Sequence, residues 1–261
     1  MANTINYSLS ASTNNNLPKV VLIHGLFGDK DNLNNLNKHL SAHFNVMSID
    51  LPGHGKSSHL SEWTFESVIT EIDTLLSEKG FYPSSIVGHS LGGKVAMAMA
   101  LLHPSKIKKI VVADIAPAIY PPRHDTVFKA LQAVQDANIE NRKQGLEILN
   151  SILVEPGTAQ FLLKSLKQID NQWRWQFNLA GLVNSYSNII GWPFSNKTYE
   201  GETLFIKGEK SDYLTQAHAQ PIKQMFPKAT FKIISDTGHW LHAEKPTVFN
   251  QIVLRMLTST N

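Results

Sequence analysis

A serine placed for nucleophilic chemistry lies in the first half of the chain, where residues 88–92 read GHSLG. This segment matches the G-x-S-x-G pattern, in which a sharp turn between a strand and a helix exposes the serine hydroxyl. Residues 84–87 predict the strand before the turn, and residues 91–102 predict the helix after it. Glycine at both ends of the motif suits so tight a turn, because side chains there would collide with neighbouring backbone. We therefore expect Ser90 to stand clear of the sheet as a nucleophile.

A serine hydroxyl is a poor nucleophile until a base removes its proton, and histidine is the usual base. The chain has 11 histidines. His239 stands out because it follows the last predicted strand, Thr230 to Ile234, at the carboxyl end where open α/β sheets place their sites. His242 lies nearer the closing helix and is expected to pack or cap there. We therefore expect His239 to be the base.

An acidic side chain is needed to orient that imidazole and to stabilise its charged form. Asp114 ends the predicted strand Ile107 to Ala113, and Asp212 follows the next one, Thr203 to Lys207. Both aspartates preserve the chain order of serine, acid and histidine that goes with this motif. Either could instead be a structural residue that caps a turn. The spacing alone leaves the choice of acid open.

The oxyanion that forms during acyl transfer needs N–H donors that are already in place. One donor is expected to be the backbone N–H of Leu91, directly after the nucleophile. The second is expected from the loop after the predicted strand Lys19 to Ile23, where residues 24–28 read HGLFG. We expect the N–H of Leu26 to fill that role, with Phe27 as the neighbouring alternative.

The elements that would position these residues alternate between apolar strands and helices, which is typical of a mostly parallel sheet covered on both faces. Residues 115–201 break this alternation. They show no clear strand, and helices are expected there over Thr126 to Val134, Ile139 to Ile152 and Thr158 to Lys167. The sequence thus predicts an α/β core of residues 1–114 and 202–261, with a helical cap of residues 115–201 inserted in it.

The later half of the predicted cap is rich in aromatic residues: Trp173, Trp175, Phe177, Tyr186, Trp192 and Phe194. We expect them to pack the cap against the core. Some of them are also expected to line an apolar acyl pocket.

Composition excludes several other classes of protein. With 261 residues, 42% hydrophobic and 17% charged, the chain is typical of a soluble globular protein. A net charge of +3 with scattered basic residues predicts no nucleic-acid partner. The absence of cysteine excludes disulfides and cysteine-ligated metals, and no histidine or carboxylate spacing predicts a metal or cofactor site. No apolar run is long enough to span a membrane, and the polar start of the chain predicts a cytoplasmic protein.

Four segments together resemble the α/β-hydrolase superfamily over nearly the whole chain: residues 24–28, residues 50–55 (DLPGHG), residues 88–94 (GHSLGGK) and residues 238–240 (GHW). Within it, residues 88–94, 114–117 (DIAP) and 238–246 (GHWLHAEKP) look like the small YbfF-like bacterial esterases, which are relatives of the abhydrolase-domain-11 proteins. The resemblance implies an esterase acting on short- to medium-chain acyl esters or on acyl thioesters. It also implies Asp114 as the acid. Those enzymes take the acid from the end of the strand that follows the helix after the nucleophile.

These observations predict a serine hydrolase that cleaves small acyl esters through a Ser90 acyl-enzyme, without a cofactor or a membrane partner. An acyl-CoA thioesterase or a carbon–carbon bond hydrolase would use the same three side chains. The alternative from a different class is a ligand-binding protein on a hydrolase scaffold. The oligomeric state is not predicted.

Overall fold

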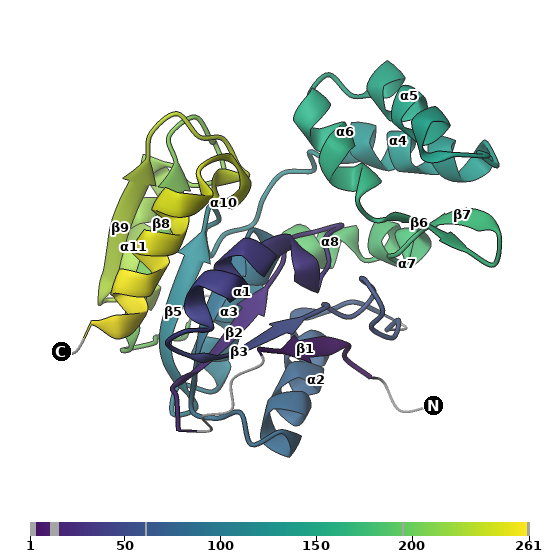
Figure 1. Cartoon of the computed structure of the whole chain (residues 1–261). Coiled ribbons are helices and arrows are strands. Elements are labelled where there is room, and N and C mark those ends of the chain that lie inside the picture. The colour runs from purple at the N-terminus through teal and green to yellow at the C-terminus, as the bar shows by residue number, and fades with distance from the viewer. Residues whose placement is uncertain (1–3, 11–15, 61, 195, 260–261) are drawn as a thin grey trace.

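A seven-stranded sheet organises the computed structural model, which describes residues 4–10, 16–60, 62–194 and 196–259 (Figure 1). The strands are β1 (Tyr7–Leu9), β2 (Lys19–Ile23), β3 (Asn45–Ile49), β4 (Ser84–His89), β5 (Ile107–Ala113), β8 (Glu202–Gly208) and β9 (Ala229–Ile234). They lie in the order β1-β3-β2-β4-β5-β8-β9. Only β1 pairs antiparallel, with β3, and the other pairs in this sheet are parallel. The sheet thus matches the predicted α/β class.

The two faces of the sheet are separated by the alternation of side chains along each strand. In β2, Val20 and Leu22 pack with α1 (Asn34–Leu40) and α11 (Pro246–Thr258). Val21 and Ile23 point to the other face, where α2 (Phe65–Glu78), α3 (Leu91–Leu102) and α9 (Ala219–Met225) pack. Helices therefore cover both faces, as the continuous apolar strands predict. Three short elements complete the core: the 3-10 helices Lys30–Leu33 and Gln216–His218, and α10 (Leu241–Glu244).

Residues 115–201 form their own group of elements between β5 and β8. These are α4 (Asp125–Asp136), α5 (Arg142–Ile152), α6 (Pro156–Leu163), β6 (Leu166–Ile169), β7 (Gln172–Trp175), α7 (Leu179–Asn184) and α8 (Tyr186–Ile190). In Figure 1, α4, α5 and α6 gather apart from the sheet, whereas α8 lies nearer to it. The segment therefore leaves the core after β5 and returns to it through α7 and α8.

Two expectations for this segment are wrong. The helix expected over 158–167 ends at Leu163, and an antiparallel hairpin of β6 and β7 follows where no strand was expected. The reason is the turn between the strands, where Asp170 and Asn171 have φ of 49° and 61°. Two consecutive residues with positive φ make the tight turn whose twist matches a hairpin, and aspartate and asparagine tolerate that conformation.

No helix in the part of the chain that the structure describes is long and apolar enough to cross a membrane.

Candidate active site

Ser90 occupies a strained turn between β4 and α3. Its backbone has φ 52° and ψ −119°, a conformation that L residues rarely adopt. The neighbouring glycines explain why the chain can turn so sharply here. A Cβ at Gly88 would lie 2.1 Å from the carbonyl oxygen of Gly92, and a Cβ at Gly92 would lie 2.3 Å from that of Ile23. Any larger residue at these two positions would push the turn apart.

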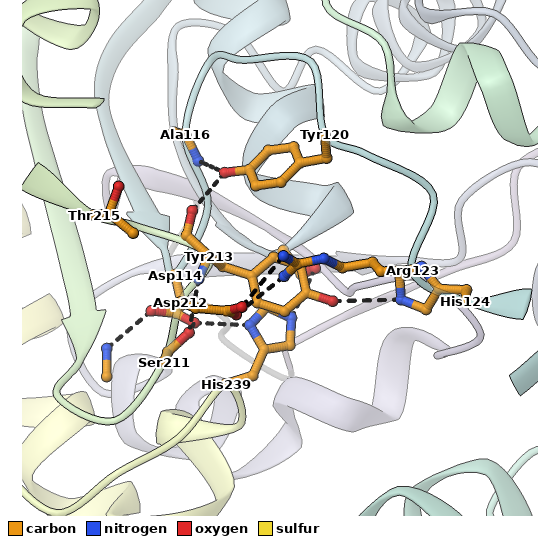
Figure 2. A network of polar contacts seen from close by, with 12 residues as sticks. Asp114, Ala116, Tyr120, Arg123, His124, Ser211, Asp212, Tyr213, Thr215 and His239 are labelled. Atoms are coloured by element: carbon orange, nitrogen blue, oxygen red, sulfur yellow. Dashed lines mark hydrogen bonds and ion pairs between the residues drawn. The ribbon is translucent and has the colours of Figure 1, made fainter. Parts of the chain in front are cut away.

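The structure brings Ser90, His239 and Asp114 together, although they are far apart in the sequence. His239 Nε2 lies 3.0 Å from Ser90 Oγ. On the other side of the ring, His239 Nδ1 lies 2.8 Å from Asp114 Oδ2 (Figure 2). A carboxylate can only accept hydrogen bonds, so Nδ1 carries the proton and Nε2 is left to accept from the serine hydroxyl. This tautomer is the one that a general base needs in order to deprotonate Ser90.

Asp114 is completely buried, and its carboxylate is held by several donors. Oδ1 accepts a 2.9 Å hydrogen bond from the N–H of Gly208, and Oδ2 accepts from the hydroxyl of Ser211 as well as from His239. The backbone of Asp114 has φ 55°, and its N–H donates to the carbonyl of Ile206 at 2.8 Å. These bonds to β8 and the loop after it fix the carboxylate against the imidazole.

Asp212, the other candidate acid, points away from His239. Its side chain is 74% exposed and forms an ion pair with Arg123, whose guanidinium nitrogens lie 3.0 and 3.2 Å from the two carboxylate oxygens. Ser211, one residue earlier, is the side chain that reaches inward. The geometry therefore supports Asp114 as the partner of His239.

Tyr213 covers one face of the His239 imidazole, a contact that sequence reasoning missed. The two ring centroids lie 3.9 Å apart with an angle of 20° between the planes. The guanidinium of Arg123 lies 4.6 Å from the centroid of the Tyr213 ring (Figure 2). The Tyr213 carbonyl accepts a 2.6 Å hydrogen bond from the hydroxyl of Tyr120, and its N–H donates to Ser211 Oγ at 3.2 Å. These contacts restrict the tilt of the imidazole.

The loop after β2 lies directly against the nucleophile. A Cβ at Gly25 would lie 3.2 Å from the Cβ of Ser90, so a side chain at this position would crowd the nucleophile. Leu26 and Phe27 follow it and line the same cavity as Ser90, and Phe27 has φ 64°. Leu91 is the first residue of α3, so its N–H is one of those without an acceptor inside the helix. The predicted donors thus lie on the two segments that flank Ser90.

His24 holds this loop in place. Its Nε2 accepts a 2.9 Å hydrogen bond from the N–H of Leu51, which leaves Nδ1–H to donate to the carbonyl of Gly25 at 2.7 Å. Burial lowers the pKa of His24, in keeping with this neutral tautomer.

A cavity of about 560 Å³ opens above Ser90. Its apolar wall comes partly from the core and partly from residues 115–201: Phe27, Val127, Leu153, Phe161, Leu162 and Trp240. None of the six aromatic residues from 173 to 194 named above is among the described residues that line it, so the expectation that some of them line an acyl pocket is wrong. Trp175 and Phe177 stack on each other, and Trp192 and Phe194 pack around Phe65. Composition did not reveal which side of the segment these rings face.

Phe161 is expected to contribute to acyl-chain preference, because its ring lines the cavity and packs 5.6 Å from Trp240. In Phe161→Ala, longer chains lose apolar contact that the shortest chain never makes, at about 0.8 kcal/mol for each methylene no longer buried. The ratio of kcat/KM for p-nitrophenyl octanoate to that for the acetate should fall about fivefold. Trp173→Ala, in the same segment but outside the cavity, should keep the ratio of the unchanged chain, and equal ratios in both variants would contradict this assignment.

Several histidines near the site are buried and uncharged. Burial, followed by the charges of His242 and His239, lowers the pKa of His89 well below its usual value, and His89 Nε2–H donates to the His239 carbonyl at 2.8 Å. Burial lowers the pKa of His242 to about 3, with smaller contributions from His239 and Lys164. The centroid of the His242 ring lies 4.3 Å from that of His89 and 6.1 Å from that of Phe249. It therefore serves packing, as its place before the closing helix predicts.

These histidines predict a loss of stability in acid. Between pH about 3 and 6.5 the unfolded chain binds a proton at His242 that the folded chain does not, so the free energy of unfolding should decrease as the pH falls. The slope approaches about 1.4 kcal/mol per pH unit for each such group. Urea unfolding across this range should give a shallower slope for His242→Gln than for the unchanged chain. The exposed His43 is the control: His43→Gln should keep the original slope, and three equal slopes would refute the prediction.

Within the described residues, no group of three histidine, aspartate or glutamate side chains is placed to hold a metal ion.

Comparison with known proteins connects this geometry to a family. The profile of the alpha/beta hydrolase family matches residues 20–252. A putative esterase/lipase of Haemophilus influenzae is 36% identical, covering 93% of this chain and 84% of that protein. Esterase YbfF of Escherichia coli is 34% identical, and the match covers 95% of this chain and 96% of that protein. Among solved structures, a marine microorganism esterase superposes with a TM-score of 0.92 at 30% identity, covering 98% of this chain and 100% of that one.

Proposed function

The chain belongs to the alpha/beta hydrolase family and is a carboxylic ester hydrolase, and on that premise we propose that Ser90, His239 and Asp114 are its catalytic triad. The observation that carries the proposal is the pair of contacts made by His239, 3.0 Å to Ser90 Oγ and 2.8 Å to Asp114 Oδ2. A base that is already within hydrogen-bond distance of its nucleophile and of its acid is what acyl transfer through serine requires.

In the first half of the proposed reaction, Ser90 Oγ attacks the ester carbonyl carbon while its proton moves to His239 Nε2. The Asp114 carboxylate stabilises the imidazolium that forms. The N–H groups of Leu91 and Leu26, or of Phe27 in place of Leu26, donate to the oxyanion. The tetrahedral intermediate then collapses, the bond to the alcohol oxygen breaks, and the alcohol leaves with the proton from His239.

In the second half, water attacks the acyl-enzyme by the same route. His239 takes a proton from the water, the oxyanion forms again in the same place, and Ser90 recovers its proton as the acid leaves. Each step is carried by side chains and backbone N–H groups of this chain.

We assign residues 115–201 as a cap on a core of residues 1–114 and 202–261. The support is that this segment forms part of the wall of the cavity above Ser90. Val127 comes from α4, Leu153 from the loop between α5 and α6, and Phe161 from α6. The apolar side chains of this wall suit an acyl chain of short to medium length. A cytoplasmic location stays a prediction from the sequence.

The proposed function is tested with a fluorophosphonate, which reacts only with an activated serine. We expect one adduct, located by mass spectrometry on the peptide that contains Ser90, and its formation should be prevented by prior heat denaturation. A panel of p-nitrophenyl esters and acyl-CoA thioesters of increasing chain length should show faster turnover of the esters. An adduct at another residue would overturn the assignment of Ser90. Faster turnover of the thioesters would show that acyl thioesters, rather than esters, are the substrate class.

A further inference from the structure

Lys94 is a buried cation next to the nucleophile whose role the proposed reaction does not explain. It lies on α3, one helical turn after Ser90, and its N–H donates to the carbonyl of Ser90 at 3.1 Å. Its side chain is nearly inaccessible, with only 2% of the residue exposed. A charged side chain rarely occupies such a position unless it satisfies specific partners.

Three backbone carbonyls surround the ammonium group of Lys94. Nζ lies 3.3 Å from the oxygen of Ile189, 2.9 Å from that of Ile190 and 2.6 Å from that of Gly191. These carbonyls belong to the end of α8, where a helix has free acceptors and favours positive charge. An ammonium has three N–H donors, so this set of acceptors satisfies it completely.

Aromatic rings, rather than carboxylates, make up the rest of the Lys94 environment. Nζ lies 5.3 Å from the ring centroid of Tyr120 and 5.6 Å from that of Phe65. Among the residues that the structure describes, no acidic side chain forms an ion pair with it. Burial lowers the pKa of Lys94 to about 7, whereas the three carbonyls favour its charged form.

The two connections between residues 115–201 and the core meet beside the Lys94 side chain. Tyr120 lies on the outgoing connection after β5, and its N–H donates to the carbonyl of Ile190 at 3.0 Å. Ile190 lies on the returning connection, and its carbonyl also accepts from Lys94. Both connections are therefore fixed at one point on α3, the helix that directly follows Ser90.

Tyr120 extends this contact to the catalytic histidine. Its hydroxyl accepts from the N–H of Ala116 at 2.9 Å and donates to the carbonyl of Tyr213 at 2.6 Å (Figure 2). Tyr213 stacks on His239. A shift of the connections at Lys94 would thus move both the cap wall of the acyl cavity and the ring that restrains the imidazole.

We propose that Lys94 is a positioning residue that pins both cap connections to α3 and thereby aligns the cap wall and Tyr213 with Ser90 and His239. This inference rests on the proposed function, because the alignment matters only for a substrate held above Ser90. Lys94 touches neither the reacting atoms nor the cavity wall, so it acts through the segments that it holds.

The decisive variant is Lys94→Met, which keeps the length of the side chain and removes its donors. Hydrogen exchange should become at least about tenfold faster in peptides that cover residues 117–121 and 187–192. The reason is that Lys94 no longer holds the backbone of these two segments in place, so their amide hydrogen bonds open more often. For the reaction, kcat/KM for p-nitrophenyl acetate should fall because Tyr213 restrains His239 less well, and kcat/KM for the octanoate should fall about tenfold further, because only the longer chain also reaches the misplaced wall. Lys129→Met, which removes an exposed lysine from α4, should leave both measurements unchanged.

A purely structural role would lower turnover of every ester by the same factor, as the fraction of folded enzyme falls. An equal loss for all chain lengths, or unchanged exchange in the two peptides, overturns the proposal. If Lys94→Met does not fold, Lys94→Gln, which keeps a polar group in the buried site but cannot supply three donors, is measured in the same way and interpreted by the same criteria. If the unchanged chain turns over no ester, the proposed function fails, and hydrogen exchange alone decides whether Lys94 pins the connections.

Discussion

Replacement of Ser90 by alanine is expected to lower kcat for p-nitrophenyl butyrate by at least about 10³-fold. The variant removes the atom that forms the acyl-enzyme, so only binding and the oxyanion donors remain to accelerate attack by water. Alanine and serine have the same Cβ, so the strained backbone at φ 52° carries the same steric cost in both. The fold should therefore survive, and circular dichroism with thermal unfolding is the check that accompanies the kinetics.

Ser77→Ala is the matched control for this experiment. Ser77 is an exposed residue of α2 that is not among the described residues lining the cavity, and its replacement should leave kcat unchanged. If Ser90→Ala retained more than about a tenth of the original kcat, the nucleophile would have to be another residue. A chain that binds the ester without any turnover, before and after the substitution, would instead be a binding protein on a hydrolase scaffold.

Much of the core could be predicted from the sequence because its signals are local. The strands at Lys19–Ile23 and Ile107–Ala113 and the helix at Leu91–Leu102 have the predicted bounds. Each is a mostly apolar stretch followed by histidine or aspartate, as expected for elements that are largely buried. The turn at Ser90 was predictable for the same reason, since its glycines and flanking elements are adjacent in the chain.

The choice between the two aspartates could not be predicted from spacing, because it depends on how neighbouring strands end. Asp114 and Asp212 both follow parallel strands that pair with each other, β5 and β8. What separates them is the backbone at Asp114, where φ of 55° turns the carboxylate toward Gly208 and His239. Asp212 lies one residue beyond the inward-facing Ser211 and so points to Arg123.

Contacts between distant segments were also outside the reach of sequence patterns. Tyr213 stacks on His239, and Lys94 holds the end of α8, but neither residue belongs to a local motif that indicates its partner. The hairpin of β6 and β7 was missed because its strands are only four residues each and its turn is an Asp-Asn pair rather than the commoner Asn-Gly. The composition of the cap shows that it is rich in aromatic residues, but it cannot show which face of the segment they occupy. That depends on which faces are buried in the folded chain.

Asp114→Asn is expected to lower kcat by about 10³- to 10⁴-fold, whereas Asp212→Asn should change it less than about threefold. An asparagine amide can present N–H to His239 Nδ1, which would place the imidazole proton on Nε2 and remove the acceptor that Ser90 needs. It also lacks the negative charge that stabilises the imidazolium. Asp212→Asn breaks only an ion pair with Arg123 in which the carboxylate is mostly exposed, and such pairs contribute little.

The two variants should also differ in how they lose activity. Because the Asp114 carboxylate acts on the imidazole rather than on the acyl chain, Asp114→Asn should lower kcat for every ester in the panel by a similar factor and leave KM nearly unchanged. Thermal unfolding separates this effect from a loss of fold, since the carbonyl oxygen of the introduced amide would still be able to accept from Gly208 N–H or Ser211 Oγ. A larger loss in Asp212→Asn than in Asp114→Asn would assign the acid to the loop after β8, and His239 would then have to turn away from the carboxylate it contacts at 2.8 Å.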